Sequence, residues 1–191
     1  MSDNSTTKKC QLVPFKGSSR KYDDVGKFKA IDDESILSNN GCCPGQTPHH
    51  LLPNAQFQTK RSGDHATDQN IEGCKDEGLF DINAYTTAGA PNMCVEGTDQ
   101  HSGSHGKIHK QSVDEFEEYL LDGSITYTES KKAALTAHND VFTSPKCSKP
   151  CLDQQLDAYY HKACHKGLKT LNPAVSDFDL RKSNGSNRKE Y

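Results

Sequence analysis

The chain has 191 residues and a formal net charge of −3, from 23 Lys and Arg against 26 Asp and Glu, and only 32% of it is hydrophobic. This length and composition favour one loop-rich domain around a single core. The charge excludes a chain-wide basic surface for nucleic acid, so phosphate binding must come from local patches or from a metal ion. No segment is apolar and long enough for a membrane span, and the amino terminus lacks the apolar core of a signal peptide, so we expect no membrane anchoring.

The composition along the chain predicts three regions. Residues 1–40 are polar and predict a partly disordered leader, residues 41–182 form the folded domain, and residues 183–191 predict a disordered tail. The first predicted strand carries a histidine doublet in the segment 49–52 and ends at Pro53, because proline cannot donate to a sheet ladder. The doublet therefore lies at the end of a strand.

A second strand is predicted over 90–97, antiparallel to the first, because this short apolar run ends in glycine. Three helices are predicted after it, over 113–122, 128–142 and 150–167. The first helix is expected to start at a capping box of Ser112 and Glu115 and to end at Gly123, and residues 105–110 either form a separate turn or continue into this helix. The predicted class is α+β, with a small two-stranded core, additional helices and long loops.

Two compact histidine clusters carry the main chemical signal. Successive side chains of a strand point to opposite faces, so His49 and His50 can divide their tasks, one holding a metal ion and the other acting on water, as in a hydrolase. His105 and His109 are spaced i and i+4, which on a helical turn places them about 5–6 Å apart on one face, close enough to share one ion. His101 has the same spacing and is a candidate substitute ligand or phosphate contact.

Eight cysteines are many for a cytosolic chain of this size, and they predict a structural metal or passage through an oxidising compartment. Cys147, Cys151 and Cys164 are candidates for a structural zinc site or for disulfides. A straight helix opening at Pro150 would separate the first two from Cys164 by about 15 Å or more, which disfavours a shared zinc. The disulfide alternatives are Cys147–Cys151 and pairs drawn from Cys42, Cys43, Cys74 and Cys94, with free buried thiols as the third possibility.

The order of these motifs is that of a ββα-metal site: a strand with a histidine doublet, a long loop, a second strand, and His-x3-His where a helix begins. The zinc deaminase signature and the His-Glu-x-x-His motif of metalloproteases are absent. Over about residues 42–165 the chain resembles the HNH/endonuclease VII superfamily of His-Me finger nucleases, and within it the bacterial polymorphic toxin nucleases with a Gly-His-His signature. The motifs that carry this resemblance are PHHLLP at 48–53, APNMCVEG at 90–97 and HGKIH at 105–109, with Pro48 where the signature has glycine.

The resemblance implies a role for each histidine. His49 would be a metal ligand, His50 the general base, and His105 and His109 the remaining ligands of one divalent ion. The ion would be Mg²⁺ or Mn²⁺ in activity, with Zn²⁺ or Ni²⁺ in a purified sample. Candidate contacts to the DNA phosphates come from the local basic patches and are Arg61, Lys107 and Lys110.

The function implied is a metal-dependent DNase that serves as the toxic module of an interbacterial secreted effector. A larger secreted protein, for example a type VI secretion effector, would deliver it to the cytoplasm of a target bacterium, and a cognate immunity protein would neutralise it. One alternative is a non-catalytic binding module stabilised by a closed four-ligand metal site. Another is a cysteine-dependent hydrolase toxin that uses Cys42 or Cys43 with a histidine of the doublet.

Overall fold

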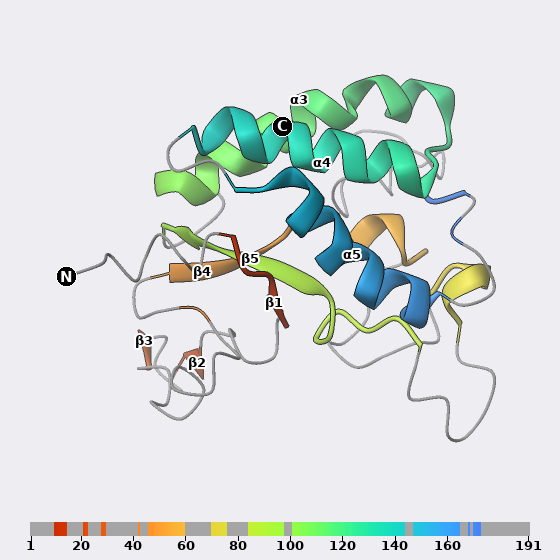
Figure 1. Ribbon diagram of the computed structural model, residues 1–191, viewed down its shortest axis with the longest axis horizontal. Helices are drawn as coiled ribbons and strands as arrows, with labels where there is room; N and C mark the ends of the chain where they lie inside the picture. Colours follow the sequence, from red (N-terminus) through yellow and green to blue (C-terminus); the bar gives the residue numbers. More distant parts are fainter. Residues whose placement is uncertain are drawn as a thin grey trace, which may run out of the picture.

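The computed structural model has an α+β fold, in which helices cover a small antiparallel sheet (Figure 1). The structure describes residues 10–14, 21–22, 28–29, 42, 46–59, 70–75, 84–97, 101–143, 147–164, 168 and 170–172. The predicted class is confirmed, and the predicted tail over 183–191 lies outside the described residues.

The sheet has the strand order β1-β5-β4, with β5 (Pro91–Glu96) between β1 (Val13–Pro14) and β4 (Gln46–His50). Both pairings are antiparallel, so the predicted pairing of the doublet segment with the second strand is confirmed. Pro48 lies inside β4 opposite Cys94. The strand tolerates this proline because β4 is at the edge of the sheet, where a missing N–H costs no ladder bond.

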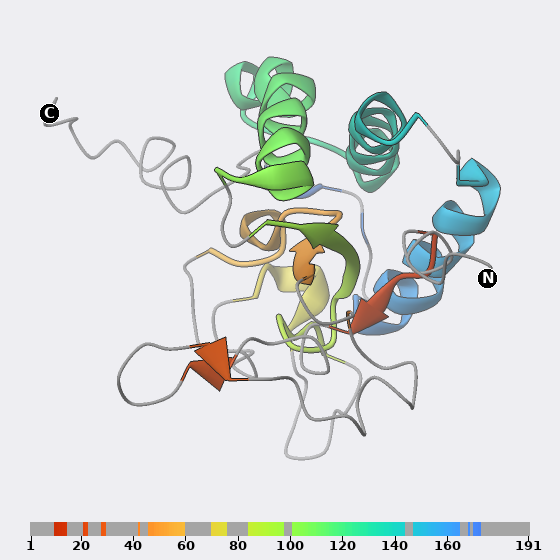
Figure 2. The ribbon, with the colours of Figure 1, turned by 90° about the vertical axis from the view of Figure 1, so that its left-hand side faces the viewer.

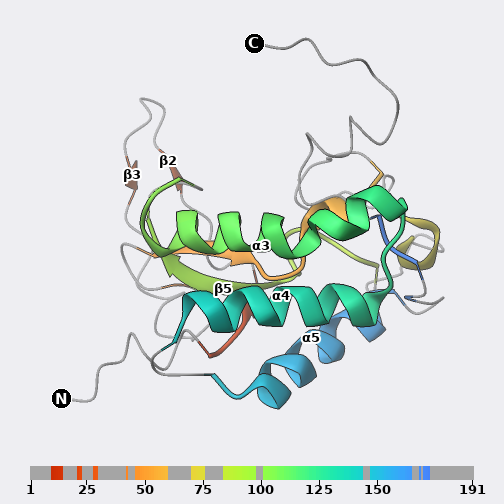
Figure 3. The same cartoon turned by 90° about the horizontal axis from the view of Figure 1, so that it is seen from above.

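Three helices follow the sheet in the chain: α3 (Gly103–Asp122), α4 (Tyr127–Val141) and α5 (Lys149–Ala163). Seen from above, α3 and α4 lie side by side over the strands, and α5 runs along the outer side of α4 (Figure 3). The shorter elements are a two-stranded sheet of β2 (Lys21–Tyr22) and β3 (Phe28–Lys29) and the 3-10 turns η2 (Asn54–Gln56) and η3 (Glu72–Cys74). Among the described helices, none combines the length and the apolar character that crossing a membrane requires.

Helix α3 begins ten residues before the predicted start at residue 113, so the predicted capping box at Ser112 is wrong. Ser112 lies in the middle of the helix and is buried, while the N-cap is Ser102. The polar stretch from Gly103 onward becomes helical because it buries one stripe of side chains against the sheet, namely His105, Ile108, Ser112 and Phe116. The carboxyl end is as predicted, with Gly123 in the left-handed conformation.

The connection from β5 to α3 is tight and depends on glycine. A Cβ on Gly97 would lie 2.1 Å from the carbonyl oxygen of Ser102, and one on Gly103 would lie 2.4 Å from that of Glu96. Both glycines also have positive φ, which disfavours any other residue. The Ser104 hydroxyl accepts a hydrogen bond from the Glu96 N–H at 2.8 Å. The start of α3 is thus fixed against the end of β5.

We expect Gly106→Ala to destabilise the protein, although alanine normally stabilises a helix interior by up to about 1 kcal/mol over glycine. The added Cβ would lie 2.6 Å from the backbone carbonyl carbon of His101, so the turn before α3 must move. The expected loss is about 1–3 kcal/mol in the free energy of unfolding, measured by urea titration.

The control is Gly123→Ala, where the added Cβ meets no atom within 4 Å and only the left-handed backbone is strained. Both variants should lose stability, but only Gly106→Ala should also weaken metal binding, because Gly106 follows His105 in the first turn of α3. A Gly106→Ala variant more stable than the wild type would contradict this account.

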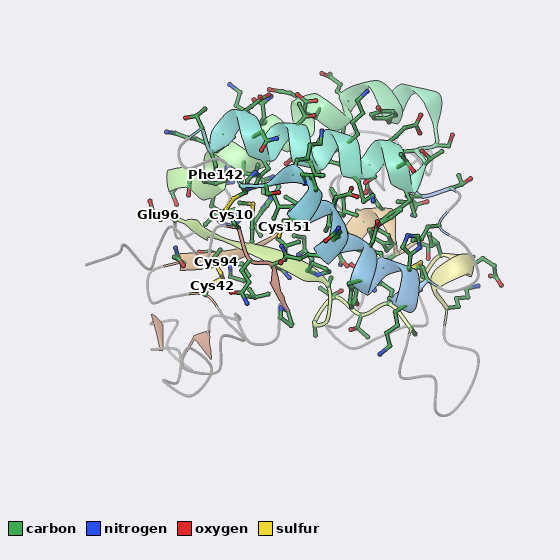
Figure 4. The ribbon with its side chains drawn as sticks, in the orientation of Figure 1. Cys10, Cys42, Cys94, Glu96, Phe142 and Cys151 are labelled. Atoms are coloured by element: carbon green, nitrogen blue, oxygen red, sulfur yellow. A yellow bond between two sulfur atoms is a disulfide. The ribbon has the colours of Figure 1, made fainter. Side chains whose placement is uncertain are left out.

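Residues 10–14 of the predicted leader are part of the folded domain, and Val13 among them is buried. Strand β1 extends the sheet beside β5, and Cys10 is disulfide-bonded to Cys147. The Gln155 side chain on α5 accepts from the Leu12 N–H at 2.8 Å and donates to the Cys10 carbonyl at 3.1 Å. Figure 4 shows Cys10 and Cys151 close to the start of α5.

Three disulfides join described cysteines: Cys10–Cys147, Cys42–Cys94 and Cys74–Cys164. The Cys42–Cys94 bond lies beside β5 (Figure 4) and is one of the pairings that the sequence left open. The Cys147–Cys151 pairing and the zinc site of Cys147, Cys151 and Cys164 are wrong, because two of these cysteines are bonded elsewhere and Cys151 is a free, exposed thiol. Cys43 lies outside the described residues.

Candidate active site

Three histidines from two elements converge between the sheet and α3. His49 comes from β4, and His105 and His109 come from successive turns of α3, which lies over the sheet in Figure 2. The ring centroid of His49 lies 5.3 Å from that of His105 and 5.4 Å from that of His109, and the centroids of His105 and His109 are 5.9 Å apart. One nitrogen of each ring lies within 4.8 Å of the other two, so the cluster could hold one metal ion.

Burial favours the neutral form of two histidines in this cluster, His49 and His109. His49 is 8% exposed and His105 is 9% exposed, while His109 is half-buried. Burial, and then the neighbouring His109, His105 and His50, hold the pKa of His49 well below its usual value. Burial, and then His101, also lower the pKa of His109. Neutral imidazoles are the form that binds a metal ion, so the lowered pKa values of His49 and His109 favour metal binding.

The donor set fits a metal ion with a free coordination position. Within the part of the chain that the structure describes, no fourth His, Cys, Asp or Glu joins the three histidines in this group. A closed structural site uses four protein ligands, whereas three ligands leave a position for water or substrate. His101 is exposed and lies in the turn before α3, so it does not continue the helical stripe of His105 and His109.

His50 follows His49 at the end of β4 but does not belong to the three-histidine group. The register pairs His49 with Met93 and His50 with Asn92, and successive residues of a strand alternate in direction, so His50 is not directed at the same point as His49. Nε2 of His50 lies 3.3 Å from the Thr87 carbonyl oxygen. A carbonyl oxygen can only accept, so Nε2 of His50 is the donor in this contact.

Asn92 is a residue that the sequence did not single out. It is fully buried, lies opposite His50 in the ladder, and donates from Nδ2 to the Ala90 carbonyl at 2.6 Å. Its Oδ1 has no hydrogen-bond partner among the described residues. Because paired residues project to the same face, a buried amide oxygen accompanies His50 on that side of the sheet. A lone asparagine in a strand gives no sequence signal of this kind.

The remaining candidates are the basic residues predicted to contact the DNA phosphates and the cysteine predicted as an alternative nucleophile. Lys107 and Lys110 are exposed on α3, the helix that carries two of the three clustered histidines. Arg61 lies outside the described residues. Cys42 is bonded to Cys94, so it offers no thiolate for the cysteine-hydrolase alternative, and the other candidate of that alternative, Cys43, lies outside the described residues.

A family model described as "GHH signature containing HNH/Endo VII superfamily nuclease toxin 2" matches residues 46–161, which contain β4, β5, α3 and both histidine clusters. The chain belongs to this family. Members of the family are nuclease toxins by its description, and the predicted resemblance is confirmed.

The chain is also similar to a curated protein, DNase toxin Tse7 of Pseudomonas aeruginosa, with 35% identity over 148 residues. The aligned part is 71% of this chain but only 36% of that relative, so the chain spans about a third of the relative's length. No solved structure matches the chain significantly.

Proposed function

We propose that this member of the GHH-signature family is a metal-dependent endonuclease that hydrolyses the phosphodiester bonds of DNA. The observation that carries the proposal is the geometry of the doublet, which places His49 in a three-histidine cluster and leaves His50 outside it on a carbonyl partner. The name of the relative, a DNase toxin, supports DNA as the substrate.

His50 is the proposed general base. Nε2 of His50 faces the Thr87 carbonyl, so the other ring nitrogen is the proposed acceptor of the proton from the attacking water. His49 cannot play this role as well, since it lies in the buried cluster.

His49, His105 and His109 are the proposed ligands of one divalent ion. A bound ion supplies Lewis-acid stabilisation of the charge that develops on the phosphate and the leaving oxygen. Imidazole ligands suit Zn²⁺ and Ni²⁺, and Mg²⁺ or Mn²⁺ is the proposed ion in activity. Lys107, Lys110 and Arg61 are proposed to contact the DNA phosphates, and His101, exposed beside His109, is a proposed phosphate contact or extra ligand.

We further propose that the chain is the toxic module of a larger secreted protein, such as a type VI secretion effector, that acts in the cytoplasm of a target bacterium. The family description and the greater length of the relative support a module within a longer protein. The three disulfides are typical of proteins that pass through an oxidising compartment, which supports export from the producing cell. A cognate immunity protein would protect the producer.

The experiment is nicking of supercoiled plasmid by the purified chain after chelation, with Mg²⁺, Mn²⁺, Zn²⁺ or Ni²⁺ added back separately. We expect no cleavage after chelation and restored cleavage with at least one ion, and RNA is tested in parallel as the competing substrate. Cleavage that persists in excess chelator would overturn the metal dependence. Absence of cleavage with every ion, while the chain binds metal and unfolds on chelation, would favour the binding-module alternative.

A further inference from the structure

Thr87 is held at both of its polar ends by the segment that carries the histidine doublet. Its carbonyl oxygen lies 3.3 Å from Nε2 of His50, and its hydroxyl donates to Oδ1 of Asn54 at 3.0 Å. His50 and Asn54 flank Leu51 and Leu52, both fully buried, so the two attachment points are four residues apart on one fixed segment. Thr87 itself is only 8% exposed.

The loop around Thr87 is anchored independently of His50. The Thr86 carbonyl accepts from the N–H groups of Gly89 and Ala90 and from the Tyr159 hydroxyl, which in turn accepts from the Thr86 N–H. The carbonyl that follows, that of Thr87, is the one that reaches His50. The loop is therefore fixed to α5 at Thr86 and to the doublet segment at Thr87.

Asn54 is the end of a buried chain of side-chain amides. Its Oδ1 also accepts from the Tyr85 hydroxyl, and its Nδ2 donates to Gln58 at 3.0 Å. Gln58 donates to Asn70 at 3.3 Å, and Asn70 donates to the carbonyls of Cys74 and Tyr85, each at 2.8 Å. A hydrogen-bonded network of this kind holds its members in one geometry, so the Gln58 and Asn70 side chains fix the orientation of the Asn54 amide.

We propose that Thr87 and Asn54 are positioning residues for His50: the Asn54 amide fixes Thr87 through its hydroxyl, and the Thr87 carbonyl then fixes the orientation and tautomer of the His50 imidazole. The inference rests on the proposed function of His50 as general base. It adds residues from outside both histidine motifs to the reaction, and neither of them touches the substrate. Removal of a residue that orients a functional group through a hydrogen bond typically lowers activity by about 10–100-fold.

The test compares Thr87→Val with Thr87→Ser in plasmid cleavage. Valine removes the hydroxyl that Asn54 holds but keeps the backbone carbonyl, so we expect kcat to fall about tenfold with an unchanged KM. Serine restores the hydroxyl and should restore kcat. In a His50→Ala background, Thr87→Val should cause no further loss, because the group that Thr87 orients is gone.

The matched control is Tyr127→Phe, which removes a hydroxyl that bonds Asp157 between α4 and α5, away from the doublet. This variant loses a hydrogen bond of the fold and should keep the wild-type kcat. The proposal is overturned if Thr87→Val cleaves as fast as the wild type, or if it slows the His50→Ala variant by the same factor as the wild type.

A second readout does not depend on cleavage. In the ¹⁵N spectrum of the metal-free protein, the His50 imidazole should be a single neutral tautomer in the wild type and in Thr87→Ser, and a mixture of tautomers in Thr87→Val. A single tautomer in all three proteins would refute the positioning role. If the wild type cleaves no nucleic acid with any ion, the nuclease proposal fails, and these spectra still decide whether Thr87 orients His50.

Discussion

His50→Ala should slow DNA cleavage severely without loss of metal binding, whereas His49→Ala should lose both. Removal of a general base slows a reaction by about 10²–10⁴-fold, so a small residual activity should remain in His50→Ala. His50 does not belong to the three-histidine group, so its removal leaves His49, His105 and His109 in place. Removal of His49 takes away one of three ligands and should weaken metal binding by more than the about 10–100-fold that outer-shell changes cost.

Metal content and affinity are measured by titration of the chelated protein, and cleavage by plasmid nicking. The matched control is His161→Ala, an exposed histidine on α5 that lies near Asp157, and it should leave both quantities unchanged. Because His49 is buried, His109→Ala serves as the second ligand variant if His49→Ala does not fold. Wild-type cleavage by His50→Ala, or loss of metal binding in that variant, would refute the division of roles within the doublet.

The second large effect is expected from the disulfide that ties the amino-terminal segment to the domain. Replacement of both Cys10 and Cys147 by serine should lower the free energy of unfolding by about 2–5 kcal/mol. This bond spans 137 positions of sequence, the longest separation among the three described disulfides, and closing a long loop constrains the unfolded chain most in the entropic model. The bond also holds β1, which has only two residues, beside β5.

Urea unfolding under non-reducing conditions measures the change, with Cys151→Ser as the control. Cys151 is a free, exposed thiol on α5, so its replacement should change the free energy of unfolding by no more than about 0.5 kcal/mol. A wild-type midpoint in the Cys10→Ser/Cys147→Ser protein would show that residues 10–14 add nothing to stability.

Together the two experiments separate function from fold. The His50 variant removes a catalytic group and leaves the fold intact. The disulfide variant lowers the stability of the fold and leaves the active-site residues intact. A disulfide variant that binds metal and cleaves DNA at low temperature, but unfolds at lower urea, would show that the covalent links maintain the domain without taking part in the reaction.

The sequence by itself determined the features that depend on neighbouring residues. The spacing of His105 and His109, the alternation of His49 and His50, and the stop at Gly123 follow from the periods of helix and strand and from the backbone freedom of glycine. The pairing of β4 with β5 followed from two short apolar runs bounded by turn residues. These local rules singled out the two histidine motifs, and the family resemblance supplied the role of each histidine.

The tertiary structure alone decided the features that depend on distant contacts. Helix α3 begins at Gly103 because the burial of its side chains outweighs the weak helix propensity of its first glycines and serines. For the same reason Ser112 is a buried residue inside the helix and not its N-cap. The cysteine partners follow from which chain segments the fold brings together, and spacing cannot show this. The same holds for Thr87 and its contact to His50, 37 positions away: a hydrogen bond between a side chain and a distant carbonyl exists only once the chain has folded.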